Sequence, residues 1–196
     1  MSRVYAWGCC ALAACVTGGS AAPRYGSLPA HDAHGRVQVV IEVPAGTNRK
    51  REYDYERNAF PVEQRDGVDR VVAFLPYPGN YGFVPSTFVD PAEGGDGDAL
   101  DVLVLAESVP VASVVPVVPI GVLHLVDHGE VDDKLLAVPA DRAARILDVA
   151  DVSELDPDVV ALLSSWFTNY KNDDGVRLES IGGAEDARAT LERWQR

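Results

Sequence analysis

The chain has 196 residues, of which 47% are hydrophobic and 24% charged, a composition typical of a soluble globular domain with a well-buried core. Its 17 basic residues stand against 30 acidic ones, which gives a formal net charge of −13 and disfavours a nucleic-acid binder, because phosphate contacts need a basic face. Beyond residue 22 the sequence has no uncharged apolar run of about 18 residues, which excludes a polytopic membrane protein.

Residues 1–22 are predicted to be an export leader. Arg3 is followed by an apolar stretch, as in a secretory signal. The three cysteines all lie here, and Leu12-Ala13-Ala14-Cys15 resembles a bacterial lipobox, in which the cysteine carries the lipid. Two alternatives remain, namely ordinary cleavage after Ala22 or a wrongly assigned start codon on a cytoplasmic enzyme. We therefore expect a periplasmic protein or a membrane-anchored lipoprotein, with membrane contact only through a lipid on Cys15.

The rest of the chain divides into a tether and one domain. Residues 23–35 are rich in Pro, Gly and His and are expected to be the tether, and residues 36–196 form the domain. The domain begins with Arg36–Val43, a run of β-branched residues that predicts a strand ended by Pro44.

The next elements are short. Tyr53–Arg57 and Val62–Arg65 are two strand candidates. Asp66-Gly67 predicts a turn before a further strand at Val68–Phe74. Pro76–Pro85 is dense in Pro, Gly and aromatic residues and is expected to be a loop.

The middle of the domain is rich in β-branched residues. Asp90–Gly97 is an acidic, glycine-rich loop, and Ala99–Ala106 is an apolar strand. Prolines and a glycine interrupt Val111–Val126, which predicts two or three short strands with bends. Lys134–Val138 is another strand.

Two helices are predicted near the C-terminus. The first begins at Asp156 as N-cap, with Pro157 at the first helical position. The second covers roughly Glu185–Arg193, and Val176–Ile181 between them reads as a strand. The pattern of short strands followed by helices predicts an α+β fold, a small closed OB-like β-barrel with flanking C-terminal helices.

Two acidic clusters follow apolar strands. Asp96, Asp98 and Asp101 fall within six residues, and their mutual repulsion would be relieved by a hard divalent cation with oxygen ligands. Taken alone, this cluster could equally be a solvated acidic turn. A second cluster, with Asp127 and Asp132, again lies at a strand end, and two such clusters favour a site for several metal ions.

The chain also supplies groups for an anionic substrate. These are basic and hydroxyl side chains spread along the domain, namely Lys50, Arg70, Lys134, Lys171, Tyr77, Tyr81 and Tyr170. Taken singly, each cation could be a solvated surface residue. Together with the carboxylates they match a layout in which Mg²⁺ ions bridge a phosphate compound to the protein.

Ordered motifs sharpen this interpretation. In chain order they are Ile41–Pro44 (I-E-I-P), Lys50–Glu52 (K-x-E), Arg70, Tyr77–Phe83 (Y-P-x-N-Y-G), Asp96–Leu103 (D-x-D-P-x-D-V-L, with Ala99 for Pro), Asp127–Lys134 (D-x(4)-D-x-K) and Tyr170-Lys171 (Y-K). From about Val37 to its C-terminus, the chain resembles the soluble family I inorganic pyrophosphatases. Two departures stand out. His128 occupies a position where relatives often have Glu, and Arg51/Tyr53 competes with Lys50/Glu52 as the K-x-E pair.

The resemblance implies hydrolysis of pyrophosphate to two orthophosphates by a metal-activated hydroxide, with Mg²⁺ or possibly Mn²⁺ as cofactor and a homo-oligomer as the assembly. The implied catalytic residues are Asp98 as general base with Tyr81, Arg70 and Lys50. The implied substrate-binding residues are Lys50, Arg70, Tyr81, Lys134, Tyr170 and Lys171. The implied metal ligands are Glu42, Glu52, Asp96, Asp101, Asp127 and Asp132. The competing functions are a catalytically inactive metal-binding barrel module and a hydrolase of another phosphate compound.

Overall fold

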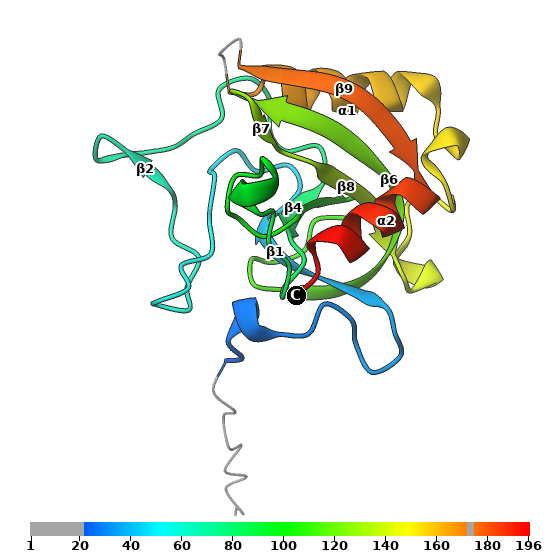
Figure 1. The fold of residues 1–196 in the computed structure, drawn as a ribbon, viewed down its shortest axis with the longest axis horizontal. Helices are drawn as coiled ribbons and strands as arrows, with labels where there is room; N and C mark the ends of the chain where they lie inside the picture. Colours follow the sequence, from blue (N-terminus) through cyan, green and yellow to red (C-terminus); the bar gives the residue numbers. More distant parts are fainter. Residues whose placement is uncertain (1–21, 172–174) are drawn as a thin grey trace, which may run out of the picture.

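A computed structural model describes residues 22–171 and 175–196 of the chain. The expected α+β fold is confirmed. The described residues form a seven-stranded sheet that curls until β1 (Val37–Val43) pairs with β6 (Val114–Asp127), which closes a small barrel (Figure 1). A ring of this kind leaves few strand edges open for pairing with other chains.

The strands lie in the order β1, β4 (Asn80–Phe83), β5 (Asp101–Val104), β8 (Lys134–Pro139) and β6. Neighbours are antiparallel except β5 and β8, which run parallel with Asp101 opposite Lys134. β7 (Glu130–Val131) and β9 (Val176–Gly183) pair with the far end of β6. A separate hairpin of β2 (Gln64–Arg65) and β3 (Val68–Asp69) projects from the barrel (Figure 1).

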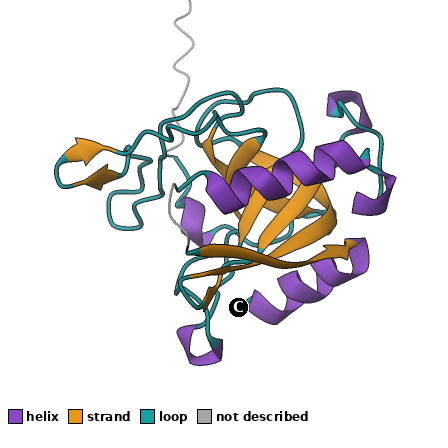
Figure 2. Ribbon diagram, turned by 90° about the horizontal axis from the view of Figure 1, so that it is seen from above, coloured by secondary structure: helices purple, strands orange, loops and turns teal. Residues whose placement is uncertain are grey.

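The two predicted helices cover opposite sides of the sheet (Figure 2). Successive strand residues point to opposite faces, so Leu103 joins the cluster under α1 (Pro157–Asn169) and its neighbour Val102 joins the cluster under α2 (Ala184–Trp194). The α1 helix begins as expected, because the Asp156 carboxylate accepts a hydrogen bond from Asp158 N at 2.9 Å. Four short 3₁₀ turns complete the description, at Tyr25–Ser27 (η1), Pro91–Glu93 (η2), Arg142–Ala144 (η3) and Val152–Glu154 (η4).

Two strand predictions on the Lys50–Pro76 arm were wrong. Tyr53–Arg57 is a turn, because the Asp54 carboxylate accepts hydrogen bonds from Glu56 N and Arg57 N at 2.9 Å and so replaces a strand partner. The strand predicted at Val68–Phe74 is reduced to β3.

Two further predictions failed for a tertiary reason. Pro76–Pro85 was expected to be a loop but contains β4, which is held between β1 and β5. Val111–Val126 was expected to be two or three short strands but forms most of the single strand β6. The bend that the prolines indicated is present as a register shift between Pro119 and Gly121. Pairing on both sides thus outweighs local breakers.

The segment expected to be a tether packs against the domain. Ser86 Oγ donates to Leu28 O at 2.8 Å, and Arg24 Nη2 donates to Tyr55 O at 2.8 Å. The Tyr25 ring lies edge-on to Phe60, with centroids 5.1 Å apart. The predicted leader lies outside the described residues except for Ala22. Within the described part of the chain, no helix is long and apolar enough to cross a membrane.

Asp151 ties η4 to the start of α2. Its carboxylate accepts from Ser153 N at 2.9 Å and from Ala184 N at 2.7 Å, and these bonds lower the pKa of Asp151 from 3.8 to about 2. A depressed carboxylate pKa stabilises the folded state above about pH 4, and the benefit disappears as the pH falls toward 2. We expect Asp151→Ala to lower the urea midpoint at pH 6, with a difference from wild type that shrinks below pH 4. A constant difference across this range would contradict the assignment.

Candidate active site

The acidic and basic motifs meet at one mouth of the barrel, around a cavity of about 70 Å³. Six residues singled out in the sequence line it, namely Glu42, Lys50, Glu52, Tyr81, Asp98 and Asp101. Tyr53, Tyr55 and Phe83 also line it, although none of them was predicted to be a site residue. Since β1, β4 and β5 are neighbours, segments some 60 residues apart in sequence bring their side chains to the same small space.

Glu42 is the most deeply buried acid of the cavity wall. It lies on β1 and is 7% exposed, and its Oε1 accepts a hydrogen bond from Tyr53 N at 2.7 Å. Burial, and after it repulsion from Asp101, raises the pKa of Glu42 from 4.5 to about 8. Because this carboxyl group holds its proton at neutral pH, a cation that binds beside it would replace the proton and neutralise the carboxylate charge.

This raised pKa makes the stability of the metal-free protein pH-dependent. The folded protein keeps the Glu42 proton where the unfolded chain has released it, so stability should fall as the pH rises from 4.5 to about 8. In EDTA, we expect Glu42→Gln to flatten the decline of the urea midpoint between pH 5 and 8. The exposed Glu130→Gln variant should keep the wild-type decline. Equal slopes in wild type and Glu42→Gln would contradict the role assigned to Glu42.

Asp96 and Asp98 lie on the exposed loop before β5. The Asp96 carboxylate accepts a hydrogen bond from Asp98 N at 2.9 Å, which fixes the loop between the two acids. Partial removal from water raises the pKa of Asp96 to about 6. Partial burial, followed by repulsion from Asp101, also raises the pKa of Asp98. A carboxylate in this state is a stronger proton acceptor than an ordinary surface Asp.

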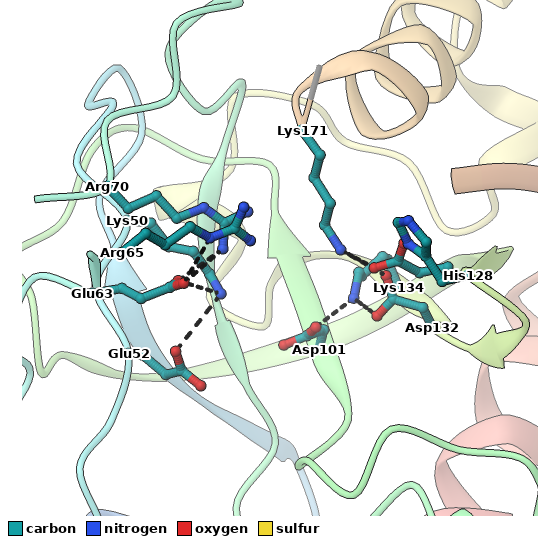
Figure 3. Close-up of polar contacts among 11 residues, drawn as sticks. Lys50, Glu52, Glu63, Arg65, Arg70, Asp101, His128, Asp132, Lys134 and Lys171 are labelled. Carbon is teal, nitrogen blue, oxygen red and sulfur yellow. Dashed lines mark hydrogen bonds and ion pairs between the residues drawn. The ribbon is translucent and has the colours of Figure 1, made fainter. Parts of the chain in front are cut away.

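Lys134 sits between two of the predicted metal ligands (Figure 3). Its ammonium group donates to Asp101 Oδ2 at 2.5 Å and also to Asp132 Oδ1. The Lys134 side chain is only 3% exposed. The parallel pairing of β5 with β8 produces this contact, since Asp101 and Lys134 are opposite each other at the strand starts.

Lys171, which follows α1, forms an ion pair with Asp127 at the end of β6. His128 Nδ1 lies 2.7 Å from the other Asp127 oxygen. Lys171 Nζ also lies 4.0 Å from Asp132 Oδ2, so this pair continues the network around Lys134. The neighbouring Tyr170 ring stacks on Trp166 with centroids 4.7 Å apart, and its position is therefore set by the α1 core.

Lys50 and Arg70 form a second basic cluster, which faces Lys134 and Lys171 across the cavity mouth (Figure 3). Both contact Glu63, an acid that the sequence analysis did not select. Lys50 also lies 3.8 Å from Glu52, which favours the Lys50/Glu52 alignment of the K-x-E motif. No local pattern indicated Glu63, because its role depends on the chain folding back beside Lys50.

Of the thirteen predicted site residues, six line the cavity. Five more lie in the ion-pair networks beside it, namely Arg70, Asp127, Asp132, Lys134 and Lys171. Tyr170 acts electrostatically on Arg70, Lys134 and Lys171. Asp96 lies apart from the cavity wall, on the loop that carries Asp98. Among residues 22–171 and 175–196, no three acid or histidine side chains are already grouped closely enough to ligate one ion. Lysine ammonium groups instead occupy the spaces between the Asp101, Asp132 and Asp127 carboxylates.

Known proteins are similar to this chain in sequence and in fold. A family model described as inorganic pyrophosphatase matches residues 39–196. The chain is 37% identical over 177 residues to soluble inorganic pyrophosphatase 2 of Chlamydomonas reinhardtii, covering 86% of this chain and 84% of that protein. It is 37% identical over 171 residues to the inorganic pyrophosphatase of Neisseria meningitidis serogroup B, covering 83% and 90%. The solved inorganic pyrophosphatase of Thermus thermophilus is similar, with a TM-score of 0.74, 31% identity and coverage of 87% and 98%.

Proposed function

The chain belongs to the inorganic pyrophosphatase family and hydrolyses pyrophosphate to phosphate, and we propose that the carboxylates and cations at the barrel mouth carry out this reaction with Mg²⁺. The supporting observation is the cavity itself, where Glu42, Asp98 and Asp101 lie in one wall with Lys50. A small anion with several negative charges needs this combination, because carboxylates recruit cations and the cations then attract phosphate.

The donor set fits hard divalent cations. The predicted ligands are all carboxylates, which is the oxygen chemistry that Mg²⁺ and Mn²⁺ prefer. Burial, with repulsion from Asp101 as a smaller cause, raises the pKa values of Glu42, Asp96 and Asp98, and a bound cation would offset both effects. Asp101 and Asp132 already share one cation, the Lys134 ammonium group. We propose that Glu42, Glu52, Asp96, Asp101, Asp127 and Asp132 hold Mg²⁺ or Mn²⁺ ions.

Bound cations would lower the pKa of the attacking water and neutralise phosphoryl oxygens. The protein's own residues then divide the remaining work. Asp98 accepts the proton of the attacking water, for which its raised pKa suits it. The two phosphoryl groups are held by six donors, namely Lys50, Arg70, Tyr81, Lys134, Tyr170 and Lys171. These donors offset the charge that develops on the leaving phosphate.

Phosphate release tests this function directly. With Mg²⁺ present, we expect rapid release from pyrophosphate and little from p-nitrophenyl phosphate, and EDTA should abolish it. Absence of release from pyrophosphate would favour the inactive binding module. Preference for the organic ester would favour the hydrolase of another phosphate compound.

We further propose that the protein is exported and lipidated on Cys15. The proposal rests on the sequence of residues 1–22 alone. Mass spectrometry of the mature N-terminus after cell fractionation decides it. A diacylated Cys15 supports the lipoprotein, a start at Pro23 supports ordinary signal cleavage, and an intact Met1 refutes export.

A homo-oligomer is proposed as the working assembly. In support, several apolar side chains of the described residues are exposed just before Pro76 and on α1, namely Val71, Phe74, Leu75 and Leu162. Leu75 O accepts a hydrogen bond from Trp166 Nε1 at 3.2 Å. Trp166 lies one helical turn after Leu162, so Leu75 lies close to α1 and the exposed residues can form one apolar surface. Light scattering coupled to gel filtration measures the mass, and a monomer of 21.0 kDa would refute the proposal.

A further inference from the structure

Glu63 occupies the space between two cations of the active site (Figure 3). Its Oε2 lies 3.0 Å from Lys50 Nζ, and its two oxygens accept from Arg70 Nη1 at 2.8 and 3.1 Å. The three side chains are 20%, 20% and 12% exposed for Glu63, Lys50 and Arg70. A carboxylate in this position is the nearest anion to both partly buried cations, and Lys50 has a more distant second partner in Glu52 at 3.8 Å.

The backbone fixes the three residues beside one another. Glu63 N donates to Lys50 O at 2.9 Å, Arg70 N donates to Glu63 O at 2.8 Å, and Lys50 N donates to Arg70 O at 3.0 Å. The Glu63 side chain, however, borders an open cleft of about 540 Å³ beside Glu52 and Gln64. The exposed Arg65 also contacts Glu63, with Nε 3.6 Å from Glu63 Oε1. The cleft gives the carboxylate a solvated place into which it can turn.

Five charged side chains lie around Lys50. Lys50, Arg70 and the exposed Arg65 contribute three positive charges, and Glu52 and Glu63 contribute two negative ones. Partial burial opposes ionisation of Glu63, but Lys50 and Arg70 outweigh it and lower the pKa of Glu63, so Glu63 is charged at neutral pH. Glu52 belongs to the proposed metal ligands, whereas Glu63 does not, so no metal ion would neutralise the Glu63 carboxylate. A phosphoryl group that binds Lys50 and Arg70 is therefore repelled by this carboxylate.

We propose that Glu63 is an internal competitor of phosphate, which holds Lys50 and Arg70 in the substrate-free enzyme and gives way when a phosphoryl group binds. The proposal rests on the proposed function, which assigns Lys50 and Arg70 to the substrate. Carboxylate and phosphoryl oxygens are equivalent acceptors for these donors, so one anion replaces the other without leaving a buried cation unpaired. The exchange weakens the retention of product phosphate.

The inference is tested with Glu63→Gln, which keeps the shape of the side chain and removes its charge. With Mg²⁺ present, we expect the inhibition constant of inorganic phosphate to fall about tenfold and the KM for pyrophosphate to fall with it, because one repulsive charge a few ångströms from the anion is lost. Glu56→Gln removes an exposed charge from the same arm and should change neither value. If Glu63 only positioned the two cations, Glu63→Gln would weaken phosphate binding, and this result would overturn the inference.

Two further measurements separate the possible failures. Arg70→Met should weaken phosphate binding. If it does so while Glu63→Gln fails to tighten binding, the inference is refuted and the proposed function stands. If Arg70→Met leaves phosphate affinity unchanged, the proposed role of Arg70 fails and the inference fails with it. A crystal structure of the wild-type enzyme with Mg²⁺ and phosphate tests the same point without a variant. Glu63 should have left Lys50 and Arg70, and retention of both contacts would refute the exchange.

Discussion

Replacing Asp98 with Asn is expected to lower kcat by about 10²–10⁴-fold, the usual effect of removing a general base. The amide has nearly the shape of the carboxylate but does not accept a proton at neutral pH. Asp98 lines the cavity, its loop is fixed through the Asp96 carboxylate, and its raised pKa favours proton transfer to it. The fold should be unaffected, because the Asp98 side chain is exposed and supports no neighbouring element.

Steady-state kinetics with saturating Mg²⁺ measure this effect. Asp66→Asn provides the control, since Asp66 is an exposed turn residue whose left-handed backbone, with φ 52°, suits Asn. Circular dichroism of both variants should match wild type. Near-wild-type turnover in Asp98→Asn would refute Asp98 as the base and leave Asp96 as the next candidate on this loop.

Lys134→Met is expected to destabilise the metal-free protein by about 3–5 kcal/mol, as when one partner of a buried ion pair is removed. Lys134 is 3% exposed and separates Asp101 from Asp132, whose side chains are 22% and 10% exposed. Without the ammonium group these two carboxylates face each other with nothing between them. Turnover should fall as well, because Lys134 is a proposed phosphate ligand.

Urea unfolding in EDTA and in Mg²⁺ separates the two roles of Lys134. If Asp101 and Asp132 are metal ligands, Mg²⁺ should stabilise Lys134→Met more than it stabilises wild type, because the cation no longer competes with the lysine. Arg177→Met is the control. It breaks an ion pair whose side chains are 65% and 55% exposed, and such pairs contribute about 0–1 kcal/mol. A loss in EDTA no larger than that of Arg177→Met would contradict the structural role.

Much of the fold was predictable because strong local signals agreed with the tertiary context. The run of β-branched residues before Pro44 became β1, and the Asp156-Pro157 start became α1. The failures occurred where contacts distant in sequence decided the outcome. β4 forms in a segment rich in Pro and Gly because β1 and β5 supply partners on both sides. β6 continues through Pro116 and Pro119 because β1, β8 and β9 pair along its length.

The sequence alone determined which residue types the site contains. The spacing of Asp96, Asp98 and Asp101 and the later Asp127 and Asp132 indicated cations, and the lysines and Arg70 indicated an anion. Motif order then indicated the family. These inferences succeed because hard cations such as Mg²⁺ take oxygen ligands, and closely spaced acids on one loop stay near each other however the chain folds.

Only the tertiary structure decided which charge contacts which. The parallel register of β5 and β8 places Lys134 against Asp101, and the return of the chain beside Lys50 places Glu63 between Lys50 and Arg70. The physical reason is that Coulomb interactions depend on distances across the barrel, which closure of the sheet sets and local sequence does not encode. The net charge of −13 indicated an excess of carboxylates, and the fold determined that one of them, Glu63, stands where the substrate is proposed to bind.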